Sequence, residues 1–296
     1  MPDELRTRYG IAEWYGQDFT SLAATQRVVF AKHALGESDA EPPTCPFQPN
    51  HPTCSKKGGV CSIQRYTEDN DHRLGQPADE PVITCPRRFE EKSLVLRWLA
   101  EVAGFPTQET QVAGEVPFMR STETNKPAGK IDMIVAHVQG ENLRWHGLEI
   151  QAVYFSGKGM TSEFEALRDD THEPPPYPSE VRRPDWRSSS AKRLMPQLEI
   201  KAPTLRRWGA KLAVAVDRPF FNAVGGTSDQ PSQDLNEGDI IWLVTSLERS
   251  AAGTWQLARD HWEVLTLEDS NKRLQAADTV SREHFESALL SRLRPL

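Results

Sequence analysis

The stretch WHGLEIQAVYFSG, residues 145–157, carries the pattern that decides the fold. Its apolar, β-branched and aromatic residues predict a buried strand, in which positions two apart share a face. Glu149 and Gln151 therefore point the same way out of an otherwise apolar run. An unpaired buried carboxylate is costly, so this pair indicates a polar site on the face of a sheet.

Two further carboxylates precede this stretch on strand-like segments. GKIDMIVAHV places Asp132 at the start of a strand, and a turn around Gly140 predicts that this strand forms a hairpin with the strand of Glu149. TQVAGEVPFM places Glu115 on an earlier strand. Carboxylates on neighbouring strands offer the oxygen ligands that Mg²⁺ prefers. The alternative is that these charges are solvated or cap the strand ends, as charged residues near strand ends usually are.

The rest of the chain alternates helical and strand patterns. FEEKSLVLRWLAEVAG has apolar residues at helical spacing and ends at Gly104, while KLAVAVD, IIWLVTSL and WEVLTL predict further strands. SREHFESALLSRL predicts a C-terminal helix capped by Ser281, and residues 1–44 predict short helices and a linker. This order predicts an α/β (α+β) fold, with a mixed sheet flanked by helices.

Composition narrows the function classes. The 296 residues carry a net charge of -7, so the molecule as a whole does not attract nucleic acid, although a local basic strip would suffice. No apolar run resembles a signal peptide or a membrane span, which predicts a cytoplasmic protein with reduced cysteines. The sequence has neither a G-x-x-x-x-G-K-[ST] phosphate loop nor a G-x-S-x-G elbow.

All four cysteines lie in a segment with few apolar residues. Cys45, Cys54, Cys61 and Cys85 have the spacing C-x8-C-x6-C-x23-C, which differs from the paired spacing of zinc ribbons. A metal held by four thiolates would stabilise such a segment, and spacing alone does not choose between iron and zinc. His51 is a possible substitute ligand, and unrelated buried cysteines are the alternative.

The carboxylate pattern resembles the PD-(D/E)xK nuclease core, in which an Asp opens one strand and (D/E)-x-K follows on the next. Here the corresponding residues are Asp132 and Glu149-Ile150-Gln151, with Gln in place of the usual Lys. A neutral amide cannot take a proton, so Gln151 could only orient the attacking water, and activation of that water would fall to the metal.

Together with the cysteines, the resemblance becomes more specific. CPFQPNHPTCSKKGGVCSI, CPRRFEEK and EIQAVYFSG resemble the NotI-type restriction endonucleases, a group that includes EagI-like enzymes, over about residues 45–217. The resemblance implies a bacterial homodimer that makes Mg²⁺-dependent double-strand cuts in DNA at a GC-rich palindrome, for which CGGCCG is our guess. It implies 5′-phosphate ends and one structural iron, or zinc, on Cys45, Cys54, Cys61 and Cys85. It also matches Glu115, Asp132, Glu149 and Gln151 to the catalytic site, with Asp132 and Glu149 as Mg²⁺ ligands.

A basic segment is the expected DNA contact. Between residues 182 and 211 nine Lys and Arg residues face two acidic ones, a net charge of +7. Ser188, Ser189 and Ser190 could cap a helix aimed at phosphate, and Arg is the commonest reader of guanine. The predicted DNA-contacting residues are Arg182, Arg183, Arg187, Lys192, Arg193 and Lys158.

The expected organisation is an N-terminal helical arm and linker (1–44), a four-cysteine metal module (45–88), a nuclease core (89–225) with a DNA-contacting segment (178–211), and C-terminal strands and a helix (226–296). Two other functions stay open. One is a non-catalytic, metal-containing DNA-binding protein, and the other is an iron-sulfur redox protein.

Overall fold

The computed structural model describes residues 7–227, 230–251, 253–275 and 280–294. The helices are α1 (Ala24–Leu35), α2 (Leu94–Val102), α3 (Thr161–Asp169), α4 (Trp186–Ser189), α5 (Met195–Arg207), α6 (Arg218–Ala223), α7 (Leu267–Leu274) and α8 (Arg282–Leu290). Shorter helical segments are η1 (Phe19–Ser21), η2 (Pro86–Ser93), the π-helical η3 (Ser190–Leu194) and η4 (Leu235–Glu237). No described helix has the length and apolar character needed to cross a bilayer.

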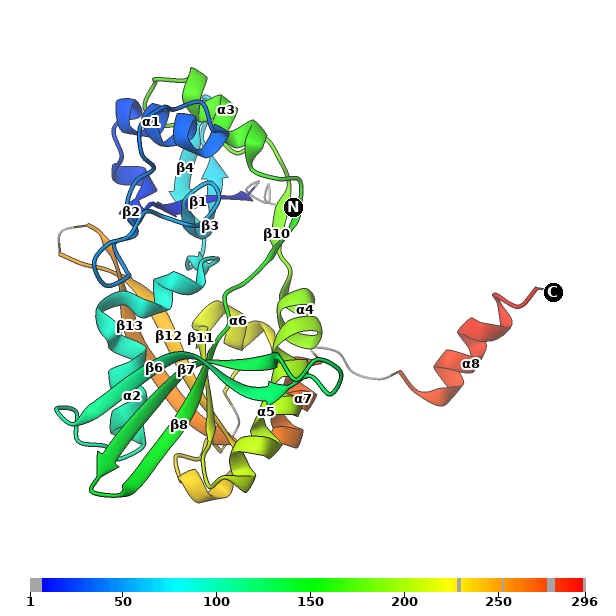
Figure 1. The fold of residues 1–296 in the computed structure, drawn as a ribbon. Helices are drawn as coiled ribbons and strands as arrows, with labels where there is room; N and C mark the ends of the chain where they lie inside the picture. The colour runs from blue at the N-terminus through cyan, green and yellow to red at the C-terminus, as the bar shows by residue number, and fades with distance from the viewer. Residues whose placement is uncertain (1–6, 228–229, 252, 276–279, 295–296) are drawn as a thin grey trace.

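Two separate sheets organise most of the strands (Figure 1). In the described part of the chain, the larger sheet has six strands in the order β13-β12-β11-β8-β7-β6. Its strands are β6 (Thr110–Arg120), β7 (Pro127–Gln139), β8 (Asn142–Ile150), β11 (Leu212–Asp217), β12 (Ile240–Arg249) and β13 (Trp255–Leu265). β11 runs parallel to β8 and β12, while the other pairs are antiparallel, so the predicted mixed sheet is confirmed.

Helices cover both faces of the larger sheet. On β11, Val214 packs in one core cluster with Leu198 of α5, whereas Ala213 packs in another with Leu99 of α2. Every residue of β11 is buried, as expected for a strand covered on both faces. The expected helix that ends before Gly104 is confirmed as α2, with Gly104 in the left-handed conformation.

The smaller sheet has the order β2-β1-β3-β4, with β5 also paired to β3. Its strands are β1 (Thr7–Trp14), β2 (Gln17–Asp18), β3 (Val60–Glu68), β4 (Leu74–Pro77) and β5 (Val82–Ile83). Figure 1 shows α1 and α3 side by side over this sheet. Trp14 of β1 packs against Phe30 of α1 and Phe164 of α3, with ring centroids 5.6 and 5.5 Å apart.

The N-terminal part differs from the expected helical arm. Residues 1–6 lie outside the described residues, residues 7–14 form strand β1, and α1 is the long helix that follows. β1 is a strand because it pairs along most of its length with β3, from Thr7 with Thr67 to Trp14 with Val60. The cysteine segment is likewise part of a sheet that residues 7–14 complete.

The strand expected over residues 145–157 is shorter than predicted. β8 ends at Ile150, and β9 (Phe155–Gly157) pairs with β10 (Arg182–Pro184) in a separate two-stranded sheet. Between them the backbone bonds elsewhere, because Val153 donates to the Ile83 carbonyl and Tyr154 to the Ser189 hydroxyl. The chain therefore leaves the larger sheet just after Gln151, whose N–H still bonds the Ala215 carbonyl of β11.

The C-terminal helix is confirmed as α8, and the Ser281 hydroxyl accepts a hydrogen bond from the His284 N–H as its cap. Figure 1 shows α8 standing apart from the rest of the protein. It has no buried residue.

Candidate active site

The hairpin brings Asp132 and Glu149 together. β7 and β8 are antiparallel with Met133 opposite Leu148, so Asp132 and Glu149 are cross-strand neighbours. The Asp132 N–H donates to a Glu149 carboxylate oxygen at 3.3 Å, and the Ile150 N–H donates to Asp132 at 3.2 Å. The predicted hairpin is confirmed, and it places the two carboxylates side by side.

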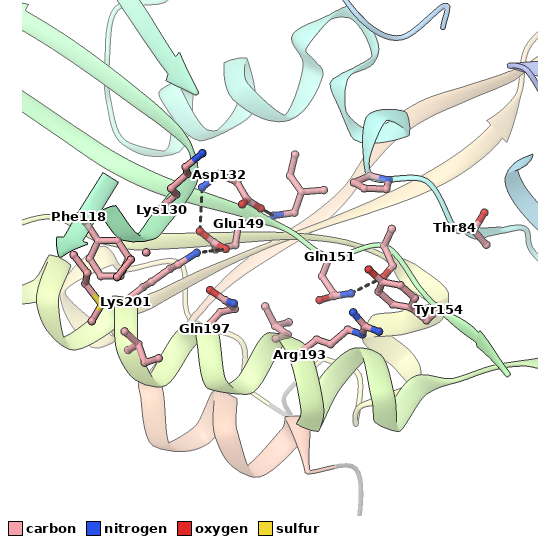
Figure 2. A pocket seen from close by; sticks show the side chains of 18 of the residues that line it. Thr84, Phe118, Lys130, Asp132, Glu149, Gln151, Tyr154, Arg193, Gln197 and Lys201 are labelled. Atoms are coloured by element: carbon pink, nitrogen blue, oxygen red, sulfur yellow. Dashed lines mark hydrogen bonds and ion pairs between the residues drawn. The ribbon is translucent and has the colours of Figure 1, made fainter. Parts of the chain in front are cut away.

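These carboxylates line a cavity of about 610 Å³ (Figure 2). Its walls come from β6, β7 and β8, from residues 151–154 after β8, from η3 and α5, and from the cysteine segment. The polar and charged side chains that line it are Lys56, Thr84, Lys130, Asp132, Glu149, Gln151, Tyr154, Arg193, Gln197 and Lys201. A cavity of this size at the end of two strands, lined by carboxylates and cations, can accept a phosphate group with a hydrated cation.

Gln151 lines the same cavity as Glu149, as the sequence pattern predicted, although it lies just beyond the strand. Its backbone N–H still bonds the Ala215 carbonyl of β11 at 3.0 Å, which continues the strand direction by one residue. Its side-chain amide donates to the Ala152 carbonyl. The amide oxygen is therefore the part of the side chain that can accept a hydrogen bond from a water.

Glu149 is buried, and its charge is balanced from an unexpected direction. Lys201 of α5 places its Nζ 2.6 Å from Glu149 Oε2, and both side chains are almost fully buried. Burial and the neighbouring Asp132 charge raise the pKa of Glu149 to about 7, whereas Lys201 acts to lower it. In the sequence, Lys201 stands out only as one cation of the basic segment. The signal that could have found it is its spacing, because Arg193, Gln197 and Lys201 recur every four residues on one helical face.

Glu115 is not brought into the cavity. Its side chain is exposed and pairs with Lys130 at 2.8 Å, and its backbone has a positive φ of 50° between Gly114 and Val116, which both pair with β7. Lys130 does line the cavity. Glu115 therefore reaches the site only through Lys130.

The two-carboxylate arrangement fits Mg²⁺. This cation keeps several waters and is typically held by one or two carboxylates together with substrate phosphate oxygens. Asp132 is exposed toward the cavity and Glu149 lies behind it, so both can offer an oxygen to one ion. Mg²⁺ needs no third protein ligand for that coordination, because water and phosphate oxygens complete it.

The four cysteines gather around one small cavity, which Tyr15 and Phe47 also line. All four are free thiols, and burial raises the pKa of Cys54, Cys61 and Cys85. Within the described ranges, however, no three or more His, Cys, Asp or Glu side chains lie in an arrangement that could hold a metal ion. The predicted four-cysteine cluster is thus present as a gathering of thiols without coordination geometry.

Part of the basic segment is not available to DNA. Arg182 is buried and forms an ion pair with Glu163, so this predicted DNA contact is instead an internal one that connects β10 to α3. Lys158 pairs with Glu180 at 3.1 Å and stays largely exposed. The other predicted DNA contacts are exposed, namely Arg183, Arg187, Lys192 and Arg193.

The expected serine cap is also wrong. Asp185 caps α4 by accepting from the Ser188 N–H at 2.9 Å. Ser189 and Ser190 are fully buried, and Ser189 accepts from the Tyr154 N–H. These hydroxyls therefore cannot face a phosphate, because the segment turns them into the core.

Comparison with known proteins agrees with this geometry. The family model of restriction endonuclease NotI matches residues 28–257, which is most of the chain. No curated protein and no solved structure matches the chain. The match favours a nuclease over the non-catalytic and redox alternatives. The chain therefore belongs to the NotI restriction endonuclease family, whose members hydrolyse DNA phosphodiester bonds.

Proposed function

We propose that this protein is a homodimeric type II restriction endonuclease that makes Mg²⁺-dependent double-strand cuts at a GC-rich palindrome, with CGGCCG as our guess for the site. The observation that carries the proposal is the pairing of Asp132 with Glu149 at the mouth of a cavity lined by basic side chains. A homodimer follows from the palindrome, because the two-fold symmetry of the DNA is matched by that of the protein.

The residues of the cavity have distinct tasks. Asp132 and Glu149 are the groups that would hold Mg²⁺. When bound, Mg²⁺ neutralises charge on the scissile phosphate and lowers the pKa of a water. Gln151 orients the attacking water by accepting a hydrogen bond, and Arg193 holds the DNA backbone beside it. Attack on phosphorus with loss of the 3′ oxygen leaves a 5′-phosphate and a 3′-hydroxyl.

Digestion of a large DNA of known sequence tests this function. We expect discrete bands with Mg²⁺, and intact DNA with EDTA or with the variants Asp132→Ala and Glu149→Ala. Glu268→Ala, an exposed carboxylate on α7, is the matched control that keeps cutting. Sequencing the ends gives the recognition site and the cut position. Wild-type cutting rates in either site variant would show that the site is wrong, and intact DNA in every lane would favour a DNA-binding protein.

We also propose that Cys45, Cys54, Cys61 and Cys85 hold one structural iron, or zinc. The supporting observation is that all four thiols of the cysteine segment line one small cavity, where burial raises the pKa of Cys54, Cys61 and Cys85. A cation would displace their protons, so binding would stabilise this segment. We expect one metal per chain by elemental analysis, a visible absorption band if it is iron, and loss of both in Cys61→Ser. Full metal content in that variant would contradict the proposal.

A further inference from the structure

We propose that Lys201 of α5 supplies the active-site cation that is missing at Gln151, just after β8, by holding Glu149 and donating a hydrogen bond to the scissile phosphate. This inference rests on the nuclease function proposed above. It assigns a role to a residue that lies 50 positions beyond Gln151, where the nuclease pattern expects its lysine.

The geometry places Lys201 in the site. Its Nζ lies 2.6 Å from Glu149 Oε2, and Figure 2 shows the two side chains meeting across the cavity from α5 and β8. An ammonium group has three N–H donors, and the structure uses one of them on Glu149. Since Lys201 also lines the cavity, its other donors can reach an oxygen placed there.

A purely structural role explains this pair poorly. The neighbouring inward positions of α5 are Leu198, Ala202 and Leu205, all buried and apolar. An apolar residue at position 201 would pack with them, and buried ion pairs seldom stabilise more than apolar replacements of similar volume. A lysine among these residues, paired with a carboxylate at the mouth of a cavity, is therefore better explained by the site.

The same helical face supports this assignment. Arg193, Gln197 and Lys201 line the cavity at four-residue intervals, opposite Glu149 and Gln151. Arg193 is further positioned by the Tyr154 ring, with its guanidinium carbon 3.6 Å from the ring centroid. The wall that β8 forms thus carries the carboxylate and the amide, and the facing helical wall carries Arg193 and Lys201.

The chemical step needs no proton from Lys201. A bond forms from the water oxygen to phosphorus, and the bond from phosphorus to O3′ breaks. The water proton passes to solvent, and O3′ takes up a proton from solvent. Lys201 keeps its proton throughout, so its contribution is the stabilisation of charge on the phosphate as that charge increases.

The test compares Lys201→Gln with the double variant Gln151→Lys/Lys201→Gln, which moves the lysine to the strand. The matched control is Lys272→Gln on α7. Single-turnover cleavage with Mg²⁺ is measured beside Mn²⁺ binding by calorimetry, DNA binding in Ca²⁺, and urea unfolding. The binding and unfolding measurements do not depend on cleavage.

We expect Lys201→Gln to slow single-turnover cleavage by about 100-fold. Mn²⁺ affinity should be unchanged or higher, because removing a cation beside Glu149 removes a competitor for that carboxylate. The strand lysine of the double variant should restore at least part of the rate, although it cannot restore the contact between α5 and β8.

Cleavage by Lys201→Gln at the wild-type rate would overturn the inference. The inference would also be overturned if Lys201→Gln cleaved more slowly only because it bound Mn²⁺ less tightly or unfolded, and if the double variant recovered none of the rate. Failure of the wild-type protein itself to cut DNA would instead count against the proposed function. In that case the Mn²⁺ affinity of Lys201→Gln still tests the inference, because a large decrease would contradict it.

Discussion

The Asp217 carboxylate accepts a hydrogen bond of 2.6 Å from the backbone N–H of Ile83. The carbonyl of Ile83 accepts another, from the Val153 N–H at 2.9 Å. Ile83 lies two residues before Cys85, and Val153 lies two residues after Gln151. One buried residue of the cysteine segment is therefore joined through its N–H to the end of β11 and through its carbonyl to the residues that follow the active-site strand β8.

This connection predicts that Asp217→Ala destabilises the protein by about 3 kcal/mol, because two buried N–H groups, of Ile83 and Phe220, lose their acceptor. The control is Asp234→Ala, which removes an exposed cap and should cost at most about 1 kcal/mol. Urea unfolding measures both. Equal effects in the two variants would show that the connection is not important for stability.

We expect the removal of Arg88 to lower the free energy of unfolding by a larger amount. It is fully buried, contacts Glu13 at 3.0 Å and Glu91 at 2.6 Å, and donates to the Trp255 carbonyl. Arg88→Ala leaves the fully buried Glu13 carboxylate without its cation, so we expect a loss of about 3–5 kcal/mol. Arg87→Ala breaks only the exposed pair with Glu90 and should cost at most about 1 kcal/mol. A small effect of Arg88→Ala on the urea midpoint would contradict this prediction.

We expect His146 to make the free energy of unfolding depend on pH. Burial, followed by the charges of Lys211 and Arg144, lowers its pKa from 6.5 to about 4, and its ring accepts from the Lys211 N–H. Below pH 6.5 the unfolded chain binds a proton that the folded protein does not. Protonation therefore favours the unfolded chain as the pH falls. Through His146, the free energy of unfolding is about 3 kcal/mol higher above pH 6.5 than it is near pH 4.

The variant His146→Asn isolates this effect, since Asn does not titrate. The unfolding free energy of the wild type minus that of the variant should be about 3 kcal/mol lower at pH 4 than at pH 7.5. Urea unfolding at several pH values measures it. A difference that does not change with pH would mean that His146 titrates normally in the folded state.

Arg193 predicts a DNA-binding effect without a stability effect. It is exposed at the cavity, so Arg193→Gln should weaken DNA binding in Ca²⁺ and reduce the slope of log affinity against log salt by about 1. Arg97→Gln on α2, which covers the opposite face of the sheet, is the control. Fluorescence anisotropy at several salt concentrations measures both. An unchanged slope for Arg193→Gln would remove this residue from the DNA contact.

For the buried Arg182 we expect the opposite result, a loss of stability without a loss of DNA binding. Because its partner Glu163 is buried with it, Arg182→Gln should lower stability by about 3 kcal/mol or more. Under conditions where the variant is folded, DNA affinity and its salt slope should stay close to the wild type. A lower salt slope with wild-type stability would restore Arg182 as a phosphate contact.

The sequence by itself determined the features that depend on local periodicity. Alternation of side chains along β7 and β8, with a short turn at Gly140, was sufficient to place Asp132 beside Glu149. The helix that ends before Gly104 and the helix capped by Ser281 were determined in the same way. These elements need only the backbone repeat and its end signals, both of which lie in residues that are close in the sequence.

Only the tertiary structure decided which distant residues meet. It paired Lys201 with Glu149, buried Arg182 against Glu163, and placed residues 7–14 beside β3 as a strand. Glu115, in contrast, was left outside the cavity. Charge and spacing cannot distinguish a cation that faces solvent from one that a facing carboxylate pairs inside the protein. That choice depends on how helices and strands far apart in the sequence pack together, because packing sets which charges lose their water.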